Sequence, residues 1–435
     1  MELVPSFGLL LQGLSVTMTA PTFASLTTLL TGWLFAGRRT VTRIILRAGD
    51  AAPKHFSSYH RLFSAARWSL DAVGLAVFDL ISPWLDSIIA LALDDTLARK
   101  RGLKVFGAGM HHDPLLSTRK TAVMNWGHSW VMLGVLVKFP FRADRYFCLP
   151  ILCRLYLNRE AAVRARRAYR TRPELAAQML GLLCQHRKSQ RFHVVADSLY
   201  GGKSVLLQLP ANCDLTSRLH LDARLYDRPP VRMPGNPGRP RKRGTRRATP
   251  RQMLHRRCRH ATLNLYGRHD RVRLADAQAV WHAAADRTLR IVAVQPLTGG
   301  RSVQAFYSTW ANATAEQVLA CYAQRWAIEQ TFQETKSHLG FEQPQGWSRR
   351  AVERTAPVAM LLYSLIVLWF ADHGHRHWQA PAHPWYRSKR SPTFADMLDS
   401  LRHETLRKTV STWGLRGTGS RKIIRALQQV ASLAA

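Results

Sequence analysis

An ordered series of apolar runs between residues 89 and 197 constrains the fold more than any other feature of the chain. Ile89–Leu93 is a short apolar run of the kind that forms a buried strand, and Asp94 and Asp95 follow it directly. Asp197 stands in the same way at the end of a later run. Between them the chain reads as two strands, a helix and a further strand, at Ser129–Phe139, Tyr146–Leu157, Pro173–His186 and Phe192–Ala196. This order predicts a mixed α/β sheet with carboxylates at its edge.

The rest of the chain divides by composition. Residues 1–88 read as short helices, a pattern that suits a helical N-terminal DNA-binding domain and a plain helical bundle equally. Residues 201–310 alternate apolar and polar side chains as strands do, and the Pro-, Gly- and Arg-rich stretch 229–259 predicts a flexible basic loop rather than a packed element. We therefore expect a catalytic core in two parts, a β-rich insertion between them, and helical regions at both ends. The expected ranges are 1–88, 89–200, 201–310, 311–372 and a basic 373–435.

Four polar residues in the C-terminal third have a spacing that suits one helix. Tyr322, Arg325, Glu329 and Lys336 would all lie on one narrow face, because each residue of an α-helix advances by about 100°. A carboxylate flanked by two cations and a phenol is the arrangement expected of a site that holds a metal ion against a phosphate. We therefore expect one helix from 315 to about 338. The alternative is that Arg325 and Glu329 form an ordinary i,i+4 pair on a surface helix.

The charge of the chain implies a polyanionic partner. There are 63 Lys and Arg residues against 27 Asp and Glu, a formal net charge of +36. Such an excess says nothing about fold, but it is typical of proteins that bind nucleic acid. A ribosomal-type RNA-binding protein would share this charge, and so would a nuclease.

Cysteine spacing and apolar segments bear on the location of the protein. None of the six cysteines forms a CxxC motif, which favours reduced thiols in a cytoplasmic protein. Val4–Ala36 carries no charge, but no Lys or Arg precedes it as a signal sequence requires. Ala356–Ala371 is apolar but short for a membrane span. We expect both segments to be core helices of a cytoplasmic, nucleoid-associated protein with no membrane partner.

Three carboxylates could form one site. Asp95 and Asp197 follow strands, and Glu329 lies on a helix that could pack over the same sheet. Carboxylates that converge repel one another unless they bind cations, and hard oxygen ligands favour Mg²⁺ or Mn²⁺. Two such ions, roughly 3.5–4 Å apart, would hold the attacking and leaving oxygens of a phosphoryl transfer. Each acid also has an ordinary alternative, since Asp95 could stand in a turn and Asp197 could cap a helix.

The sequence resembles a known family at these residues. Tyr322–Lys336 is similar to the Y-(2)-R-(3)-E-(6)-K signature of bacterial insertion-sequence transposases with a DDE triad. Leu93–Thr96 and Ala196–Gly201 resemble the first and second acidic motifs of that family. The resemblance spans about 90–345, and its third motif is the most specific. It implies a ribonuclease-H-like catalytic core interrupted by a mostly β insertion, with DNA cleavage at the ends of a mobile element and attack of the freed 3′-OH on target DNA.

The resemblance also implies roles for individual residues. By position, Asp95, Asp197 and Glu329 would be the catalytic metal ligands for two Mg²⁺ ions, for which Mn²⁺ could substitute. Asp94 competes with Asp95 as the first ligand, and Asp95 is preferred because the acid of the family directly precedes Thr. The residues that would contact phosphates at the transposon ends are Tyr322, Arg325 and Lys336. The implied partners are double-stranded DNA, as terminal inverted repeats and as target, and a second copy of the chain in a homodimer.

Three further segments carry open alternatives. Arg239, Arg241 and Lys242 resemble an AT-hook core that lies in a narrow A·T-rich minor groove, or they form a non-specific basic linker. An aromatic residue in the insertion could stack on a flipped base, or could pack in the core; the candidates are Phe306, Tyr307 and Trp310. The histidine clusters 111–113 and 373–377 have no recognised metal spacing and predict surface or loop histidines.

These observations favour a DNA transposase that cuts and joins through two metal ions. One alternative is a ribonuclease-H-fold nuclease that cleaves without joining. Another is a basic DNA-binding protein that has lost activity or been repurposed, which would show salt-sensitive binding without metal-dependent cleavage. The presence of all three acids and both cations argues against loss of activity.

Overall fold

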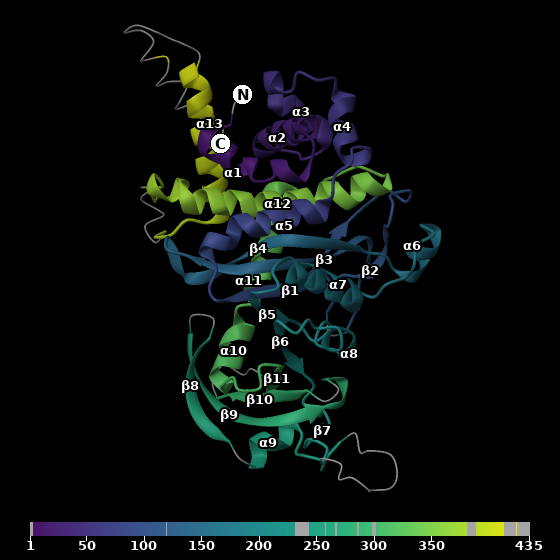
Figure 1. The fold of residues 1–435 in the computed structure, drawn as a ribbon, viewed down its shortest axis with the longest axis vertical. Coiled ribbons are helices and arrows are strands. Elements are labelled where there is room, and N and C mark those ends of the chain that lie inside the picture. Colours follow the sequence, from purple (N-terminus) through teal and green to yellow (C-terminus); the bar gives the residue numbers. More distant parts are fainter. Residues whose placement is uncertain are drawn as a thin grey trace. The chain divides into compact units, whose positions relative to one another are not determined.

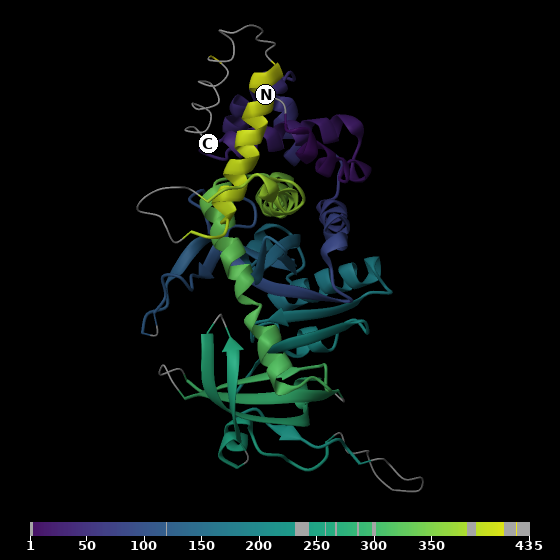
Figure 2. The ribbon, with the colours of Figure 1, turned by 90° about the vertical axis from the view of Figure 1, so that its left-hand side faces the viewer.

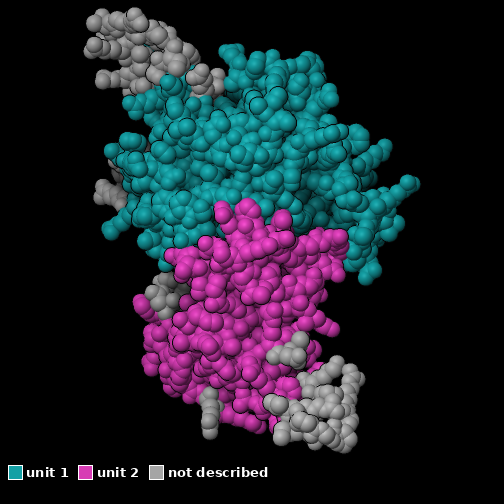
Figure 3. Space-filling view, in the orientation of Figure 1, with its two compact units in different colours: residues 1–85, 95–169, 329–435 teal, residues 86–94, 170–328 magenta. Residues whose placement is uncertain are grey.

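The computed structural model of the chain describes residues 3–118, 120–230, 243–256, 258–265, 268–284, 287–297, 302–380, 389–412 and 423. These residues form a mixed α/β protein with a ribonuclease-H-like core, which confirms the predicted fold class. The chain divides into two compact units, shown in two colours in Figure 3. Unit 1 comprises Met1–Leu85, Asp95–Tyr169 and Glu329–Ala435, and unit 2 comprises Asp86–Asp94 and Arg170–Ile328. The five ranges expected from the sequence remain a prediction.

A long antiparallel hairpin forms the centre of unit 1. Its strands are β3 (Met124–Phe139) and β4 (Arg142–Tyr156), and β2 (Gly109–His112) pairs with the start of β3. β3 is buried without interruption from Gly127 to Val137. A continuous buried run is expected where both faces of a strand are covered.

Two helices cover one face of this hairpin (Figure 1). They are α5 (Leu70–Ile81) and α12 (Arg349–Asp372). Gly74 of α5 lies so close to β4 that an added Cβ would be 1.9 Å from the carbonyl oxygen of Ile151. From α12, the Ser364 hydroxyl donates to the Pro150 carbonyl at 2.8 Å. Both helices therefore pack closely on β4, and at Gly74 the backbones of α5 and β4 are in direct contact.

Among the described residues, α12 is the one helix that is long and apolar enough to cross a membrane by length and composition. Its most apolar 18-residue window is 94% buried within the protein. The expectation that the apolar run at 356–371 packs in the core agrees with this burial. The helix is longer than the run, because the polar first turn Arg349–Glu353 extends it.

The N-terminal helices lie on the side of α12 away from the strands (Figures 1 and 2). Trp369 of α12 donates its indole N–H to the Ser6 hydroxyl at 2.9 Å. Arg354, one turn into α12, donates to the carbonyls of Ala66 and Trp68 at 2.8 and 2.7 Å. These contacts hold α1 (Pro5–Gln12) and the segment after α4 (Phe56–Ser64) against α12. The helices α2 (Ala20–Phe35) and α3 (Val41–Ala48) pack on each other and on α4.

Unit 2 is built on strands that change from parallel to antiparallel. The first part of β1 (Ile88–Arg99) pairs in parallel with β5 (Arg191–Ala196), and β5 pairs in parallel with β6 (Cys213–Leu219). The following strands are all antiparallel: β11 (Gln304–Ser308), β10 (Thr288–Pro296), β9 (Arg268–Trp281), β8 (Arg259–Leu265) and β7 (Leu225–Tyr226). Parallel pairing thus joins β1, β5 and β6, and antiparallel pairing joins the other described strands of the unit.

Alternate residues of the insertion strands face two different helices. Leu274 and Val292 belong to the core cluster with α10 (Ala315–Ala323), whereas Ala275 and Ala293 pack with Leu254 of α9 (Pro250–Arg256). This two-residue period is that of a strand with both faces covered. The remaining helices are α6 (Arg159–Arg164), α7 (Arg172–His186), α8 (Lys203–Leu206), α11 (Trp326–Leu339) and α13 (Phe394–Thr412).

The helix α9 corrects the expectation that 229–259 contains no packed element. Thr249 and Gln252 cap it reciprocally, with backbone-to-side-chain distances of 3.1 and 3.3 Å, and Pro250 follows the cap. Pro at the first helical position is favourable because no hydrogen bond is lost there. The start signal was present in the sequence, but the surrounding arginines and glycines obscured it.

A buried histidine makes unit 1 sensitive to acid. His128 on β3 is 1% exposed, and its Nε2–H donates to the Phe106 carbonyl at 2.9 Å. Burial first, and then the nearby Lys100 and His111, lower the pKa of His128 from its ordinary 6.5 to about 4. As the pH falls from 6.5 to about 4, an unfolded chain therefore binds a proton at this residue and the folded chain does not. Stability is lost over that interval.

We expect His128 to lower the free energy of unfolding by about 2 kcal/mol between pH 7 and pH 5, at about 1.4 kcal/mol per pH unit of unequal proton binding. The variant His128→Gln keeps an N–H donor for Phe106 and does not titrate. Urea unfolding of both proteins at the two pH values measures the effect, since other groups titrate alike in each. An equal loss of stability in the two proteins would contradict the account.

Candidate active site

The parallel pairing of β1 with β5 in unit 2 ends directly before the first two acidic motifs. The register of β1 and β5 ends with Leu93 opposite Ala196. Asp94 and Asp197 are the next residues along the chain. The prediction that an acid ends the strand therefore agrees with the structure for Asp197, which follows β5.

β1 does not end at its acids, contrary to the expectation from the sequence. It continues to Arg99, because Thr96 and Ala98 are buried and the N–H of Lys100 donates to Trp126 of β3 at 2.9 Å. Asp94 and Asp95 thus lie within the strand, where successive side chains point to opposite faces.

The two neighbouring acids have different partners. Asp94 accepts a hydrogen bond from Arg325 at 2.5 Å, and the side chains of this ion pair are only 16% and 17% exposed. Asp95, in unit 1, accepts a hydrogen bond from the buried Ser129 hydroxyl of β3 at 3.3 Å. Asp94, the competing first ligand, is therefore engaged with a cation.

Asp197 is held by its own loop. Its Oδ1 accepts backbone N–H groups of Leu199 at 2.9 Å and of Tyr200 at 3.4 Å. Its carbonyl oxygen accepts the Ser217 hydroxyl at 2.7 Å. At Gly201 an added Cβ would lie 2.3 Å from the Ser217 hydroxyl, so the loop needs glycine there. These contacts fix the direction of the carboxylate, as an Asp that turns the chain does.

The segment that carries Glu329 is not a single helix, and that expectation is wrong. α10 ends at Ala323 and α11 begins at Trp326. Across the junction, the N–H groups of Arg325 and Ile328 bond three residues back, to Tyr322 at 3.1 Å and to Arg325 at 3.0 Å. Bonds of this spacing tighten the chain, so the four residues do not share one continuous helical face. Glu329 lies in the first turn of α11, where helix N–H groups favour negative charge.

Tyr322 and Lys336, predicted to contact DNA phosphates, contact protein groups. Tyr322 is 7% exposed and packs on Phe306, with ring centroids 4.6 Å apart. In unit 1, Lys336 donates to the Leu97 carbonyl at 2.7 Å and lies 3.4 Å from Glu342. Arg325 pairs with Asp94. All three residues predicted to contact DNA phosphates therefore have partners within the chain.

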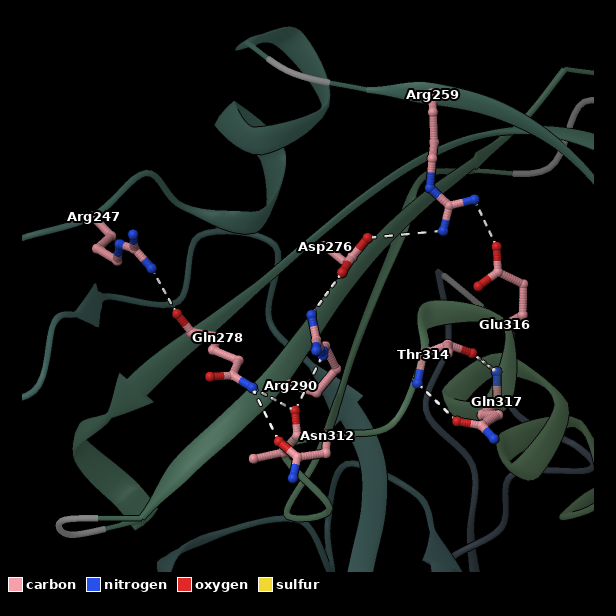
Figure 4. A network of polar contacts seen from close by, with 10 residues as sticks. Arg247, Arg259, Asp276, Gln278, Arg290, Asn312, Thr314, Glu316 and Gln317 are labelled. Atoms are coloured by element: carbon pink, nitrogen blue, oxygen red, sulfur yellow. Dashed lines mark hydrogen bonds and ion pairs between the residues drawn. The ribbon is translucent and has the colours of Figure 1, made fainter.

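A polar network in unit 2 fixes the start of α10 (Figure 4). Arg259 of β8 donates to Glu316 at 2.6 Å and lies 3.9 Å from Asp276 of β9. Arg290 of β10 donates to the same Asp276 at 2.8 Å. The hydrogen bond from Arg259 is the main reason why the pKa of Glu316 is lowered. The helix that precedes Glu329 is thereby tied to three strands of the insertion.

The candidates for base stacking are chiefly core residues. Tyr307 is fully buried and donates to the Gly201 carbonyl at 2.6 Å, and burial raises the pKa of its phenol. Phe306 is 3% exposed, and Trp310 is partly buried against the same cluster. The packing alternative therefore describes their positions in the structure. Arg239, Arg241 and Lys242 lie outside the described residues.

The acids of the site have the donor chemistry that hard divalent cations prefer, since all are carboxylates. Within the ranges that the structure describes, however, no three His, Cys, Asp or Glu side chains are grouped closely enough to hold one ion. The donor types therefore fit Mg²⁺ or Mn²⁺, whereas the assignment of three ligands to one centre remains a prediction.

Comparison with known protein families identifies the chain as a member of one family. The family of DDE superfamily endonucleases matches residues 10–277, more than half of the chain, and the chain therefore belongs to that family. Membership implies DNA as the substrate and divalent metals as the usual cofactors. Asp95 and Asp197 lie inside the matched residues, and Glu329 lies beyond them. No curated protein matches the chain.

Two features of the site were not expected from the sequence. The pairing of Asp94 with Arg325 joins residues 231 positions apart, and no local pattern indicates it. Ser129 lies at the start of a predicted strand, and nothing in that apolar run marks it as a partner of Asp95. Both partners became identifiable only from the packing of strands and helices.

Proposed function

We propose that this endonuclease is the transposase of an insertion sequence, which cuts DNA at the ends of a mobile element and joins the freed 3′-OH to target DNA. The observation that carries the proposal is the parallel register of β1 and β5, which ends with Leu93 opposite Ala196, directly before Asp94–Asp95 and Asp197. Family membership supports the endonuclease step. The Tyr322–Lys336 signature supports the joining step.

In this proposal Asp95, Asp197 and Glu329 are the catalytic carboxylates and bind two Mg²⁺ ions, for which Mn²⁺ can substitute. When bound, such cations compensate phosphate charge and polarise the attacking and leaving oxygens. The protein itself orients the ligands. Backbone N–H groups fix Asp197, and the Ser129 hydroxyl positions Asp95.

We expect the segment Tyr322–Lys336, which also carries Glu329, to make the first set of contacts with DNA. Arg325 and Lys336 bind backbone phosphates after exchanging their partners within the chain, and Tyr322 supports that surface. Arg239, Arg241 and Lys242 enter the minor groove of A·T-rich DNA. The partners are terminal inverted repeats and target DNA, held by a homodimer in the cytoplasm at the nucleoid.

The test uses the full chain, a linear DNA that carries the gene with its flanking sequence, and a supercoiled target plasmid. With Mg²⁺, and not with EDTA, we expect breaks at fixed positions on both sides of the gene and products joined to the plasmid. Breaks without joined products would show that the protein is a nuclease without joining activity. Salt-sensitive binding without any break would show that the protein binds DNA but has no catalytic activity. Either result would contradict the proposal.

A further inference from the structure

A small pocket lined by arginines lies among the N-terminal helices of unit 1, far in sequence from the acidic motifs. Its volume is about 180 Å³, and Ala36, Gly37, Arg38, Arg43 and Arg47 line it. Arg43 and Arg47 are one turn apart on α3, and Arg38 comes from the segment between α2 and α3. One concave surface thus gathers three guanidinium groups.

The fold holds these arginines in place. Gly32 of α2 approaches α3 so closely that an added Cβ would lie 2.0 Å from the Ile44 carbonyl oxygen. The segment before α3 is anchored by Arg39, whose N–H donates to Gln343 at 2.6 Å and whose side chain donates to the Gly37 carbonyl at 2.9 Å. The walls of the pocket are therefore set by backbone packing, while the side chains of Arg38, Arg43 and Arg47 are exposed.

The charge of the pocket has no counterpart within the described chain. Arg38, Arg43 and Arg47 make no hydrogen bond or ion pair with any residue that the structure describes. Asp50 is the one acidic residue in the sequence between Leu3 and Leu70. Like charges one helical turn apart are unfavourable, so a cluster of this kind is stabilised by an anion from outside. Guanidinium groups bind phosphate oxygens with two parallel hydrogen bonds.

We propose that this arginine pocket binds a backbone phosphate of duplex DNA. The choice of DNA as the source of the phosphate rests on the proposed function, whereas the pocket itself does not. The neighbouring α4 contacts α3 through His60 and Thr42 at 3.4 Å and carries an exposed Phe56. A phosphate in the pocket would place α3 and α4 against the DNA and fix their register on it.

The experiment measures binding of the full chain to a 30-base-pair mixed-sequence duplex by fluorescence anisotropy, in EDTA and over a series of KCl concentrations. The test variant is Arg43→Gln/Arg47→Gln. The matched control is Arg101→Gln/Lys104→Gln, which removes the same charge from an exposed loop of unit 1. The binding measurement needs no metal ion. It can therefore be interpreted even if the protein shows no DNA cleavage in the test of the proposed function.

The pocket variant should bind at least about tenfold more weakly than the control, since it forgoes charge-assisted hydrogen bonds to phosphate. Its plot of log K against log salt should be shallower by about one for each phosphate that the protein no longer neutralises. Arg38→Gln, outside any helix, should weaken binding in the same direction without altering the fold. Equal affinity and slope in pocket and control variants would overturn the proposal.

Discussion

Replacement of Glu329, Asp197 or Asp95 by the corresponding amide should abolish DNA strand cleavage and leave DNA binding nearly unchanged. The amide keeps the shape of the side chain and removes the charge that a divalent cation needs. The rate should fall on the order of a thousandfold or more, because the compensation of phosphate charge is lost. Cleavage is measured in Mg²⁺ on DNA carrying the element ends, and binding is measured in EDTA on the same DNA.

Asp94→Asn is the matched control for this series. It removes a carboxylate from the adjacent position of the same strand and removes the ion pair between Asp94 and Arg325. We expect it to reduce cleavage far less than Asp95→Asn. If Asp94→Asn abolished cleavage and Asp95→Asn did not, the first ligand would be Asp94. A normal cleavage rate for Glu329→Gln would refute the assignment of the site altogether.

Gly74→Ala should destabilise the protein by about 3 kcal/mol, because the added methyl group would overlap the Ile151 carbonyl and force α5 away from β4. The control is Gly8→Ala in α1, where no other atom lies within 4 Å of the new methyl group. That change should stabilise the helix by about 0.5–1 kcal/mol, since Ala restricts the unfolded chain more than Gly does.

Urea unfolding monitored by circular dichroism compares the two glycine variants with the parent chain. Opposite signs for the two substitutions are expected. If Gly74→Ala were as stable as the parent, α5 and β4 could separate without cost, and close backbone approach would not hold this part of unit 1 together.

The strands and helices of the core were predictable because their apolar runs are long and uninterrupted. The strands β3, β4 and β5 and the helix α7 lie within a few residues of the expected ranges. The extension of β1 beyond Asp95 was not predictable, because it depends on pairing with a strand some thirty residues later. A local apolar pattern indicates where a strand lies, whereas its full length depends on the strands beside it.

The candidate site was predictable only in part. The spacing from Tyr322 to Lys336 suggested one helix, since no Gly or Pro interrupts it. The helix breaks nonetheless at 324–325, where Tyr322 packs on Phe306 and Arg325 pairs with Asp94. Such contacts between distant segments override local periodicity. The arginine pocket could not be predicted from local sequence either. Only the packing of α2 on α3 brings Arg38 beside Arg43 and Arg47.

The ion pair between Arg325 and Asp94 has a consequence for DNA affinity. A phosphate that binds Arg325 displaces a carboxylate, so the event is an exchange of one anion for another. The phosphate releases its condensed cation when it binds Arg325, but the Asp94 carboxylate that loses Arg325 takes up a cation from solution, so the net release is small. Arg325 should therefore contribute to the geometry of the complex while adding little to its dependence on salt. The steepness of that dependence would then count mainly those arginines that have no acidic partner in the free protein.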